Sequence, residues 1–377
     1  MQIFVMGLTH TQTTVEFTTC AFTMKVWNLC RMLHDLGHEI IHLGTEGSNP
    51  VCTEHVSVTP YDMWKDLYGK PGSGFYKFDV DGKYAPYQQL YVDNARNAIK
   101  SRMRSPWESI ICVTWGDAQR WAVETPDIPQ HVVESGIGYK HTFAKHRVFE
   151  SYAWMHMLYG VDQRHRGEGW YDVVIPNAFD PSMFTYKEKK DNYFLYLGRL
   201  NDDKGIYIAR DLASRTGIPL KIVGQGNPDR FLSGSPFVTY HPPVGVEERR
   251  ELLANAKALI CPTIYVEPFG GVAVEAQISG TPVICTDWGG FSETVCHGYT
   301  GYRCRNMSQF LWAANNIDRI SPAVCRKWAM DNFSLDRIGK MYDEYFHTVA
   351  DLKYTEGWYY MGRTRTELDW LKKEFPH

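Results

Sequence analysis

Short apolar runs alternate with segments of helical hydrophobic spacing at the start of the chain. Residues 2–7 read QIFVMG, an apolar run ending in glycine that favours a buried parallel strand. Helical spacing follows and stops at Gly37, a residue typical of helix C-termini. Its apolar positions are Phe22, Val26, Leu29, Cys30, Leu33 and Leu36. Residues 38–44 (HEIIHLG) predict the next strand, so the chain opens with a β-α-β unit whose crossover should be right-handed.

Two further apolar runs in the first half, 109–116 (SIICVTWG) and 130–136 (QHVVESG), predict more buried strands. Residues between about 50 and 90 lack a clear period and are rich in Tyr, Gly and Pro, so we expect an irregular insertion there. A polar stretch at 187–192 (KEKKDN) precedes a new apolar run at 192–198. This change in pattern indicates a linker between two domains.

The second half repeats the alternation of strand and helix. Strands are predicted at 192–198, 220–224, 258–263 and 282–286, and helices at 204–216, 246–256 and 271–279. Such alternation is typical of a parallel sheet with helices on both faces. We therefore expect an α/β protein with two Rossmann-like, doubly wound domains facing each other across a cleft, at 1–175 and 176–340. A helical tail at 341–377 either crosses back to the first domain or packs on the second.

Composition agrees with two globular domains. The chain has 377 residues, more than one ordinary core accommodates, with 44% hydrophobic and 22% charged residues. Its net charge of −3 gives no bulk attraction to nucleic acids or acidic membranes. The sequence contains neither a signal-peptide pattern nor an apolar run long enough to span a membrane. Nine cysteines without paired spacing favour a reducing compartment, so we expect a cytoplasmic protein.

Two cations follow the first predicted strand of the second domain. In YLGRLNDDKG (196–205), Gly198 and Arg199 come directly after the strand, and Lys204 stands near the start of the next helix. Because the carboxyl ends of parallel strands meet at one edge, both cations can reach a common anion there. Arg presents a planar fork to phosphate oxygens and Lys a point charge. The alternative is a pair of solvated surface charges, and the position at a strand exit favours the anion site.

A glycine pair follows the next strand, in LKIVGQGN (220–227). Gly224 and Gly226 form a G-x-G, but Asp229 stands where the dinucleotide-binding fingerprint has its third glycine. Taken alone, this pair is better explained by a tight turn. The incomplete fingerprint argues against a nicotinamide oxidoreductase, and no phosphate-binding P-loop motif occurs in the chain.

The densest candidate chemistry lies at 263–290. Glu267 precedes a predicted helix, Gly270 and Gly271 open it, and Glu275 sits about one turn inside. Glycines let a ligand approach the main chain, and a helix N-terminus attracts anions. The two carboxylates can accept hydrogen bonds from hydroxyl groups on either side of a bound phosphate. Either glutamate alone could be a solvated helix carboxylate, but the whole set predicts a site for a nucleotide-linked sugar.

These residues resemble the signature of the retaining family-four glycosyltransferases, which have the GT-B fold. The similar motifs are YLGRL…DKG, LKIVGQG, EPFGGVAVEAQISGTPVICTDWGGFSETV and HGYTGY, within about 170–330. The resemblance implies that Arg199 and Lys204 hold the donor diphosphate and that Glu267 holds the donor sugar. It further implies donor contacts at Gly198, Gly224, Val244, Phe269, Gly270, Gly271 and Val272, with Glu275 on the ribose hydroxyls and the base near 243–246.

The first domain departs from the family pattern. The glycine pair usual after the first strand is missing, and Leu8-Thr9-His10-Thr11 follows Gly7 instead. The family tends to carry a histidine near the reacting sugar carbon, and His10 and His141 are candidates here. Glu134, at a predicted strand end, is a further candidate on the acceptor side. Each of these polar residues could equally be structural.

The resemblance implies departure of the diphosphate without a metal or other cofactor. Arg199, Lys204 and the helix N-terminus would stabilise the negative charge that develops on the leaving group. The one D-x-D motif, at 79–81, reads as a turn rather than a metal site. The predicted activity is transfer of a hexose from a UDP- or GDP-sugar to an acceptor hydroxyl. The acceptor is a carbohydrate or another molecule, and nucleic acid is among the candidate acceptors. A sugar-nucleotide epimerase and a non-catalytic sugar-nucleotide-binding protein are the rival functions.

Overall fold

The computed structural model divides the chain into two compact units. It describes residues 1–17, 20–69, 81–105, 107–128, 131–161, 169–232, 235–352 and 367–368. The first unit comprises Met1–Glu150, Leu158–Ala178 and Leu335–His377, and the second comprises Ser151–Met157 and Phe179–Ser334. The chain therefore passes from one unit to the other after Glu150, Met157, Ala178 and Ser334.

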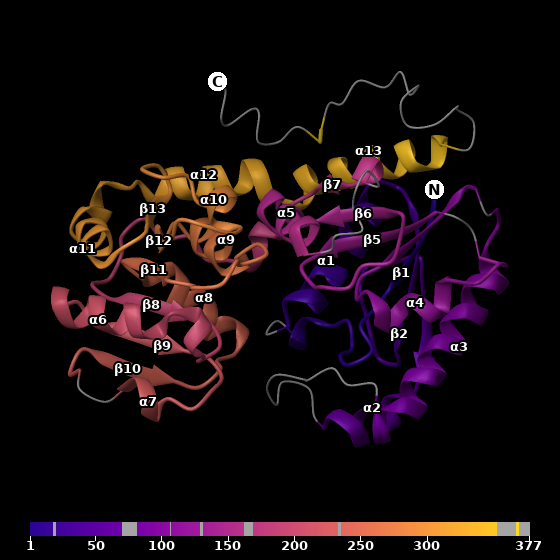
Figure 1. The fold of residues 1–377 in the computed structure, drawn as a ribbon, viewed down its shortest axis with the longest axis horizontal. Coiled ribbons are helices and arrows are strands. Elements are labelled where there is room, and N and C mark those ends of the chain that lie inside the picture. The colour runs from indigo at the N-terminus through magenta and orange to yellow at the C-terminus, as the bar shows by residue number, and fades with distance from the viewer. Residues whose placement is uncertain are drawn as a thin grey trace. The chain divides into compact units, whose positions relative to one another are not determined.

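The first unit is built on a parallel sheet with the strand order β3-β2-β1-β4-β5-β6-β7 (Figure 1). The strands are β1 (Gln2–Met6), β2 (Glu39–Thr45), β3 (Glu54–Thr59), β4 (Ser109–Val113), β5 (Val132–Ile137), β6 (His146–Phe149) and β7 (Val173–Val174). All residues of β1 and β4 are buried, which explains why their sequences are continuous apolar runs.

Helices cover both faces of this sheet. One face carries α3 (Ala85–Arg102) and α4 (Asp117–Val123), whose apolar residues share a core with β1, β2 and β4. The other carries α1 (Ala21–Asp35), which contacts β1 and packs along α13 (Leu335–Asp351). The helix α2 (Tyr61–Tyr68) also belongs to this unit, whereas α5 (Tyr152–Val161) starts in the second unit and ends in the first. Short 3-10 helices lie at Val15–Phe17, Gly82–Tyr84 and Gly169–Tyr171.

The expectation of an irregular insertion at 50–90 is wrong where the structure describes this stretch. It contains β3, α2 and the start of α3, while 70–80 lie outside the described residues. The strand β3 escaped prediction because it is an edge strand with exposed Glu54 and Ser57, so it has no continuous apolar run. The helix α2 has only eight residues and fully buries one of them, Trp64.

The second unit has a parallel sheet with the order β10-β9-β8-β11-β12-β13. Its strands are β8 (Phe194–Leu197), β9 (Leu220–Val223), β10 (Val238–His241), β11 (Ala258–Cys261), β12 (Val283–Thr286) and β13 (Gly301–Cys304). Strands β9 and β10 extend the sheet on one side of β8, and β11 to β13 extend it on the other. The direction of winding thus reverses between β8 and β11, the position where open parallel sheets bind ligands.

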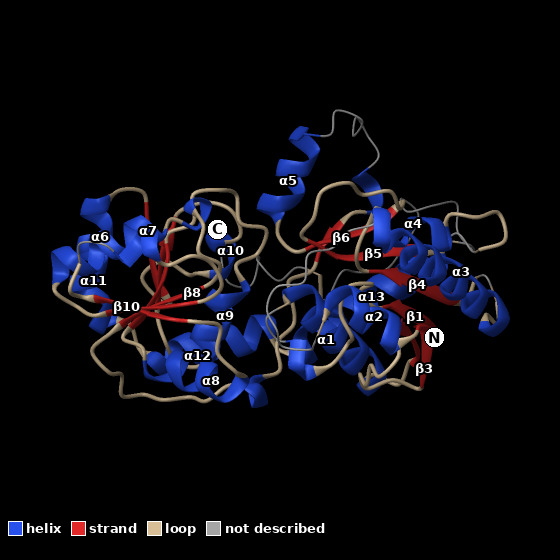
Figure 2. Cartoon of the chain, turned by 90° about the horizontal axis from the view of Figure 1, so that it is seen from below, coloured by secondary structure: helices blue, strands red, loops and turns tan. Residues whose placement is uncertain are grey.

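Helices lie on both faces of the second sheet as well (Figure 2). On one face, α6 (Ile206–Thr216), α7 (Asp229–Leu232) and α11 (Met307–Asn316) enclose a core around Phe194 and Ile260. On the other, α8 (Val246–Asn255), α9 (Gly271–Ile278) and α10 (Phe291–Thr294) enclose a core around Leu195 and Leu259. The helix α12 (Pro322–Phe333) packs on α9, and 3-10 helices lie at Pro181–Met183, Asp202–Lys204 and Ile317–Arg319.

Two doubly wound parallel sheets confirm the predicted α/β fold class. None of the helices in the described part of the chain is long and apolar enough to cross a membrane. The helix α13 belongs to the first unit, while the aromatic residues of the tail from Trp358 to Trp370 lie outside the described residues.

Candidate functional site

Two loops at the carboxyl edge of the second sheet carry the predicted cations and Glu267. Gly198 and Arg199 follow β8 directly, and Lys204 ends the 3-10 helix beyond them. Glu267 lies in the loop between β11 and α9, and Gly271 begins α9. The strands β8 and β11 are hydrogen-bonded neighbours, so their exits meet where the winding reverses. We call Gly198, Arg199, Lys204, Glu267, Gly271 and Glu275 the edge site.

Lys204 and Glu267 form an ion pair at the centre of the edge site. The Nζ of Lys204 contacts Oε2 of Glu267, and the side chains are 20% and 13% exposed. The Tyr265 hydroxyl donates a hydrogen bond of 2.9 Å to the same oxygen, and Nζ lies 4.9 Å from the centre of its ring. Burial lowers the pKa of Lys204, but the charge of Glu267 and the Tyr265 hydroxyl outweigh it, so the pKa lies above its usual value. Lys204 is therefore a cation at neutral pH.

Tyr265 could not be predicted as part of the site, because an aromatic residue shortly after a strand carries no motif of its own. Its backbone carbonyl accepts a hydrogen bond of 3.2 Å from the Trp288 indole, which ties it to the loop after β12. Burial raises the pKa of the Tyr265 hydroxyl, with a further increase from the Glu267 charge. Tyr265 therefore stays protonated and donates to Glu267.

Arg199 is exposed in the loop that follows β8. The Tyr196 hydroxyl donates a 2.8 Å hydrogen bond to the Arg199 carbonyl and so fixes the backbone from which the guanidinium extends. Tyr196 itself is buried in the core under α6. The edge site thus places two cations, Arg199 and Lys204, on the same short segment.

The glycines of the site differ in what the fold demands of them. Gly270 has φ of 81°, and a Cβ there would lie 2.4 Å from the Phe291 ring. Gly224 is equally constrained, because its Cβ would lie 1.8 Å from the Gly198 carbonyl oxygen. Gly271 would meet only an ordinary contact, Phe179 at 3.4 Å, and Gly198 has nothing within 4 Å. Neither packing nor backbone conformation therefore explains glycine at positions 198 and 271.

Glu275 lies on α9 and forms an ion pair with Arg249 of α8 through its Oε2. The side chains of Arg249 and Glu275 are 23% and 18% exposed, so water reaches both. The sequence did not single out Arg249, because it stands in the ordinary charged run EERRE of an exposed helix. Phe269 is buried, and Val272 and Val244 are half-buried at the rim of the core between α8 and α9.

The predicted residues of the first unit are divided between β5 and the loops after β1 and before β6. Gly7 follows β1, and a Cβ there would lie 2.9 Å from Nε2 of the buried His42. His10 is 3% exposed, and burial lowers its pKa to about 4, so the ring is neutral at pH 7. Its ring lies 5.1 Å from the Trp115 ring in the loop after β4. Trp115 also contacts Phe22 at the start of α1, and sequence reasoning missed this aromatic contact.

Glu134 is fully buried within β5. Its carboxylate accepts hydrogen bonds of 2.9 Å from the backbone N–H groups of Phe143 and Ala144 and one of 3.1 Å from the Tyr139 hydroxyl. Burial raises its pKa to about 7 despite these hydrogen bonds. The carboxylate thus secures the loop before β6. His141 is exposed in that loop and has φ of 67°.

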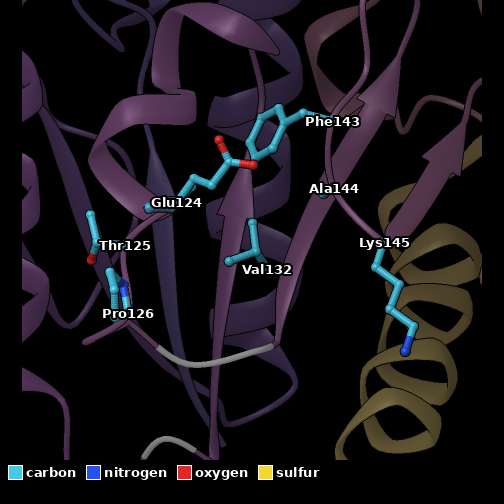
Figure 3. A pocket seen from close by; sticks show the side chains of 8 residues that line it. Glu124, Thr125, Pro126, Val132, Phe143, Ala144 and Lys145 are labelled. Carbon is cyan, nitrogen blue, oxygen red and sulfur yellow. The ribbon is translucent and has the colours of Figure 1, made fainter.

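Figure 3 shows a pocket of about 410 Å³ in the first unit. It lies beside the end of α4, the start of β5 and the residues that precede β6, with Glu124 and Phe143 on its wall and Lys145 pointing away. None of the predicted site residues lines it. Ligands of open parallel sheets bind at the carboxyl ends of the strands, whereas this pocket lies near amino ends.

Metal-binding side chains do not gather in the described ranges, where no group of three or more His, Cys, Asp or Glu could hold an ion. The D-x-D motif is described only at Asp81, which is exposed, because Asp79 and Val80 lie outside those ranges.

Residues 181–320 match the family model of the glycosyl transferases group 1. Glycogen synthase of Mycobacterium tuberculosis (strain CDC 1551 / Oshkosh) is 32% identical over 151 residues, which cover 35% of this chain and 36% of the relative. D-inositol 3-phosphate glycosyltransferase of Rhodococcus erythropolis is 29% identical over 189 residues, covering 42% of this chain and 41% of the relative. The chain thus spans about two fifths of the length of these relatives.

Solved structures resemble nearly the whole chain. AviGT4, a glycosyltransferase involved in avilamycin A biosynthesis, matches with a TM-score of 0.66 and 18% identity, over 93% of this chain and 98% of its own. Alr3699/HepE of Anabaena, in complex with UDP and glucose, matches with a TM-score of 0.62 and 15% identity, over 91% and 98%. The second unit is thus similar to the group 1 glycosyltransferases over 181–320, and the two parallel sheets of the chain are those of the GT-B fold.

Proposed function

We propose that this protein is a retaining glycosyltransferase that moves a hexose from a nucleoside-diphosphate sugar to an acceptor hydroxyl. The observation that carries the proposal is the Lys204–Glu267 ion pair in two loops that also carry Gly198 and Gly271. Neither packing nor backbone conformation requires glycine at these two positions. Open space beside the main chain, next to a cation and a carboxylate, suits a ligand with both phosphates and hydroxyl groups.

In this proposal the donor diphosphate binds Arg199 and Lys204. The Glu267 carboxylate, which pairs with Lys204 in the free protein, then accepts hydrogen bonds from the sugar hydroxyls, and the Tyr265 hydroxyl keeps it in place. As the bond between sugar and phosphate breaks, negative charge grows on the diphosphate. The two cations and the N-terminus of α9 stabilise that charge, which is the role a metal ion plays in other transferases.

Glu275 would bind the ribose hydroxyls through the oxygen that Arg249 leaves open. The base would lie near Val244 in the loop after β10. The Tyr240 hydroxyl, on β10 itself, donates a 3.0 Å hydrogen bond to the Gly224 carbonyl. UDP-glucose is the first donor to test, because the Alr3699/HepE neighbour is described with UDP and glucose. The acceptor would meet the first unit, with His10 as a neutral ring beside Trp115.

The test is turnover of radiolabelled UDP-glucose, ADP-glucose and GDP-mannose, followed by chromatography of the products. Transfer or slow release of free hexose supports the proposal, whereas conversion of the sugar nucleotide to an isomer supports the epimerase. Binding without any product supports the non-catalytic alternative. In an active protein, Glu267→Gln should lower the rate by about a hundredfold or more.

Lys257→Ala is the matched control for this test. Lys257 also forms a lysine–carboxylate pair in the second unit, to Asp318 at 2.6 Å, but it lies at the start of β11 rather than at its exit. The control should turn over at the wild-type rate. A Glu267→Gln variant as fast as this control would contradict the assignment of the donor sugar to Glu267.

A further inference from the structure

The segment that begins at Ser151 is attached to the loop that carries Glu267. Here the chain leaves the first unit, and Ser151–Met157 belongs to the second unit although its neighbours on both sides belong to the first. The helix α5 starts within this segment, at Tyr152. Ser151 precedes the helix directly and is completely buried.

Ser151 makes two hydrogen bonds through one hydroxyl group. Its Oγ accepts a 3.0 Å hydrogen bond from the Trp154 backbone N–H, as the capping residue of a helix does. Its proton is donated to the backbone carbonyl of Pro268 at 2.6 Å. Pro268 lies between Glu267 and Phe269, so the cap of α5 is fixed to the centre of the loop that precedes α9.

Glu293 connects the same two elements by a second route. Its carboxylate oxygens accept hydrogen bonds from the backbone N–H groups of Tyr152 at 2.9 Å and Ala153 at 2.8 Å. Glu293 is 8% exposed and lies on α10, just after Gly290. The N–H of Gly290 in turn donates a 2.7 Å hydrogen bond to the Glu267 carbonyl. The start of α5 is therefore linked to both Pro268 and Glu267.

Helix capping alone does not require this arrangement. A serine cap satisfies one free N–H group at a helix start, and water satisfies the others at an exposed end. Here the buried carboxylate of Glu293, about 140 positions away, accepts hydrogen bonds from two more N–H groups of the helix start. The serine hydroxyl donates its proton to the loop that carries Glu267 rather than to solvent. A third contact holds the same loop, because the Phe179 ring stacks on Phe269 with 6.2 Å between ring centres.

We propose that Ser151 and Glu293 are positioning residues for the loop that contacts the donor sugar. The inference rests on the proposed function, and it assigns to the Ser151–Ala153 segment a role in holding Glu267, Phe269 and Gly270 at the hexose. The nucleotide is held elsewhere, at Lys204, Glu275 and the loop after β10. Loss of either positioning residue therefore affects binding of the hexose and leaves binding of the nucleotide intact.

The experiment compares the affinities of UDP-glucose and UDP by titration calorimetry. Ser151→Ala should weaken UDP-glucose binding by about tenfold, the effect of one buried hydrogen bond. Binding of UDP should stay within about twofold of wild type, and Ser151→Thr, which keeps the hydroxyl, should restore UDP-glucose binding. Glu293→Gln should weaken binding of UDP-glucose in the same selective way. A carboxylate accepts hydrogen bonds at both oxygens, whereas an amide has one oxygen and an NH2 group that only donates.

Ser101→Ala is the matched control, because the Ser101 hydroxyl also donates to a backbone carbonyl, that of Ala98 at 3.1 Å, but in α3 of the first unit. It should leave both affinities unchanged. The inference would be overturned, without affecting the proposed function, if Ser151→Ala and Glu293→Gln lost affinity for UDP and UDP-glucose equally. It would also be overturned if neither variant lost affinity for UDP-glucose. Failure of the wild type to bind UDP-glucose, ADP-glucose and GDP-mannose would overturn it together with the proposed function.

Discussion

Glycines that the fold requires and glycines that it does not require alternate within a few residues of the edge site. Gly270 has a left-handed backbone and no room for a Cβ, whereas Gly271, the next residue, has an ordinary helical start and room for one. Sequence reasoning treated both alike, as a pair that lets a ligand approach. The sequence does not distinguish them, because the crowding of Gly270 comes from Phe291, which is distant along the chain.

The two glycines should respond differently to substitution. Gly270→Ala should destabilise the protein by about 3 kcal/mol, from the strained backbone and the contact with Phe291. Gly271→Ala should melt within a few degrees of wild type, since Ala is at least as favourable as Gly in a helix. This variant should nevertheless bind UDP-glucose about tenfold more weakly, because the added methyl group occupies space that the ligand needs. Thermal melting and calorimetry test this, and a Gly271→Ala variant with wild-type affinity would contradict the proposed ligand position.

Arg249 is expected to orient Glu275 for the ribose. If so, wild type should bind UDP about tenfold more tightly than 2′,3′-dideoxy-UDP, because the hydroxyls supply hydrogen bonds to a carboxylate. In Arg249→Ala the Glu275 side chain loses its partner, and the preference should fall below about threefold. Competition binding measures both ratios. An unchanged preference would show that Arg249 has no part in ribose binding.

At the scale of elements, the second unit could be predicted almost strand by strand, and the first could not. The central strands of the second unit, β8, β9, β11 and β12, are short apolar runs, and a loop motif follows each of them. Hydrophobic pattern and motif therefore support the same prediction. Strands β10 and β13 went unnoticed because each is an edge strand without such a run. In the first unit, β3 and α2 bury too few residues to give a period.

The loop before β6 should make the stability of the first unit depend on pH through Glu134. Its pKa of about 7 in the folded protein exceeds the ordinary value of 4.5, so the folded state binds the proton more tightly. The stabilisation is complete below pH 4.5 and is lost as pH rises through 7, by about 3 kcal/mol. The lowered pKa of buried His10 makes the folded state less stable at acid pH, which is the opposite effect. The pH dependence of wild-type stability therefore does not isolate the contribution of Glu134.

Glu134→Gln isolates the contribution of this carboxyl group. The difference in free energy of unfolding between variant and wild type should shift in favour of the variant between pH 4.5 and 7.5. Denaturant unfolding across this range, followed by a probe in the first unit, measures the shift. A difference that does not change with pH would mean that Glu134 titrates normally in the folded protein.

At the scale of the whole molecule, the two units differ in how much their sequences disclose. The family match covers 181–320, within the second unit, while the resemblance to solved structures extends over nearly the whole chain. A donor site requires particular residues at fixed strand exits, and these leave motifs in the sequence. The first unit keeps the buried parallel strands without such motifs, so its fold class could be predicted, although its edge strand β3 and the short helix α2 could not. The positioning contacts of Ser151 and Glu293 join segments far apart in the chain, which no periodicity encodes.

The most direct test of the central claim is calorimetric titration of wild type and Lys204→Ala with nucleoside-diphosphate sugars, beside the Lys257→Ala control. The account predicts that wild type and control bind at least one of UDP-glucose, ADP-glucose and GDP-mannose with equal affinity. Lys204→Ala should bind it ten- to a hundredfold more weakly, about the effect of one charged hydrogen bond to phosphate. Equal affinity of Lys204→Ala and wild type would contradict a donor diphosphate held at the edge site.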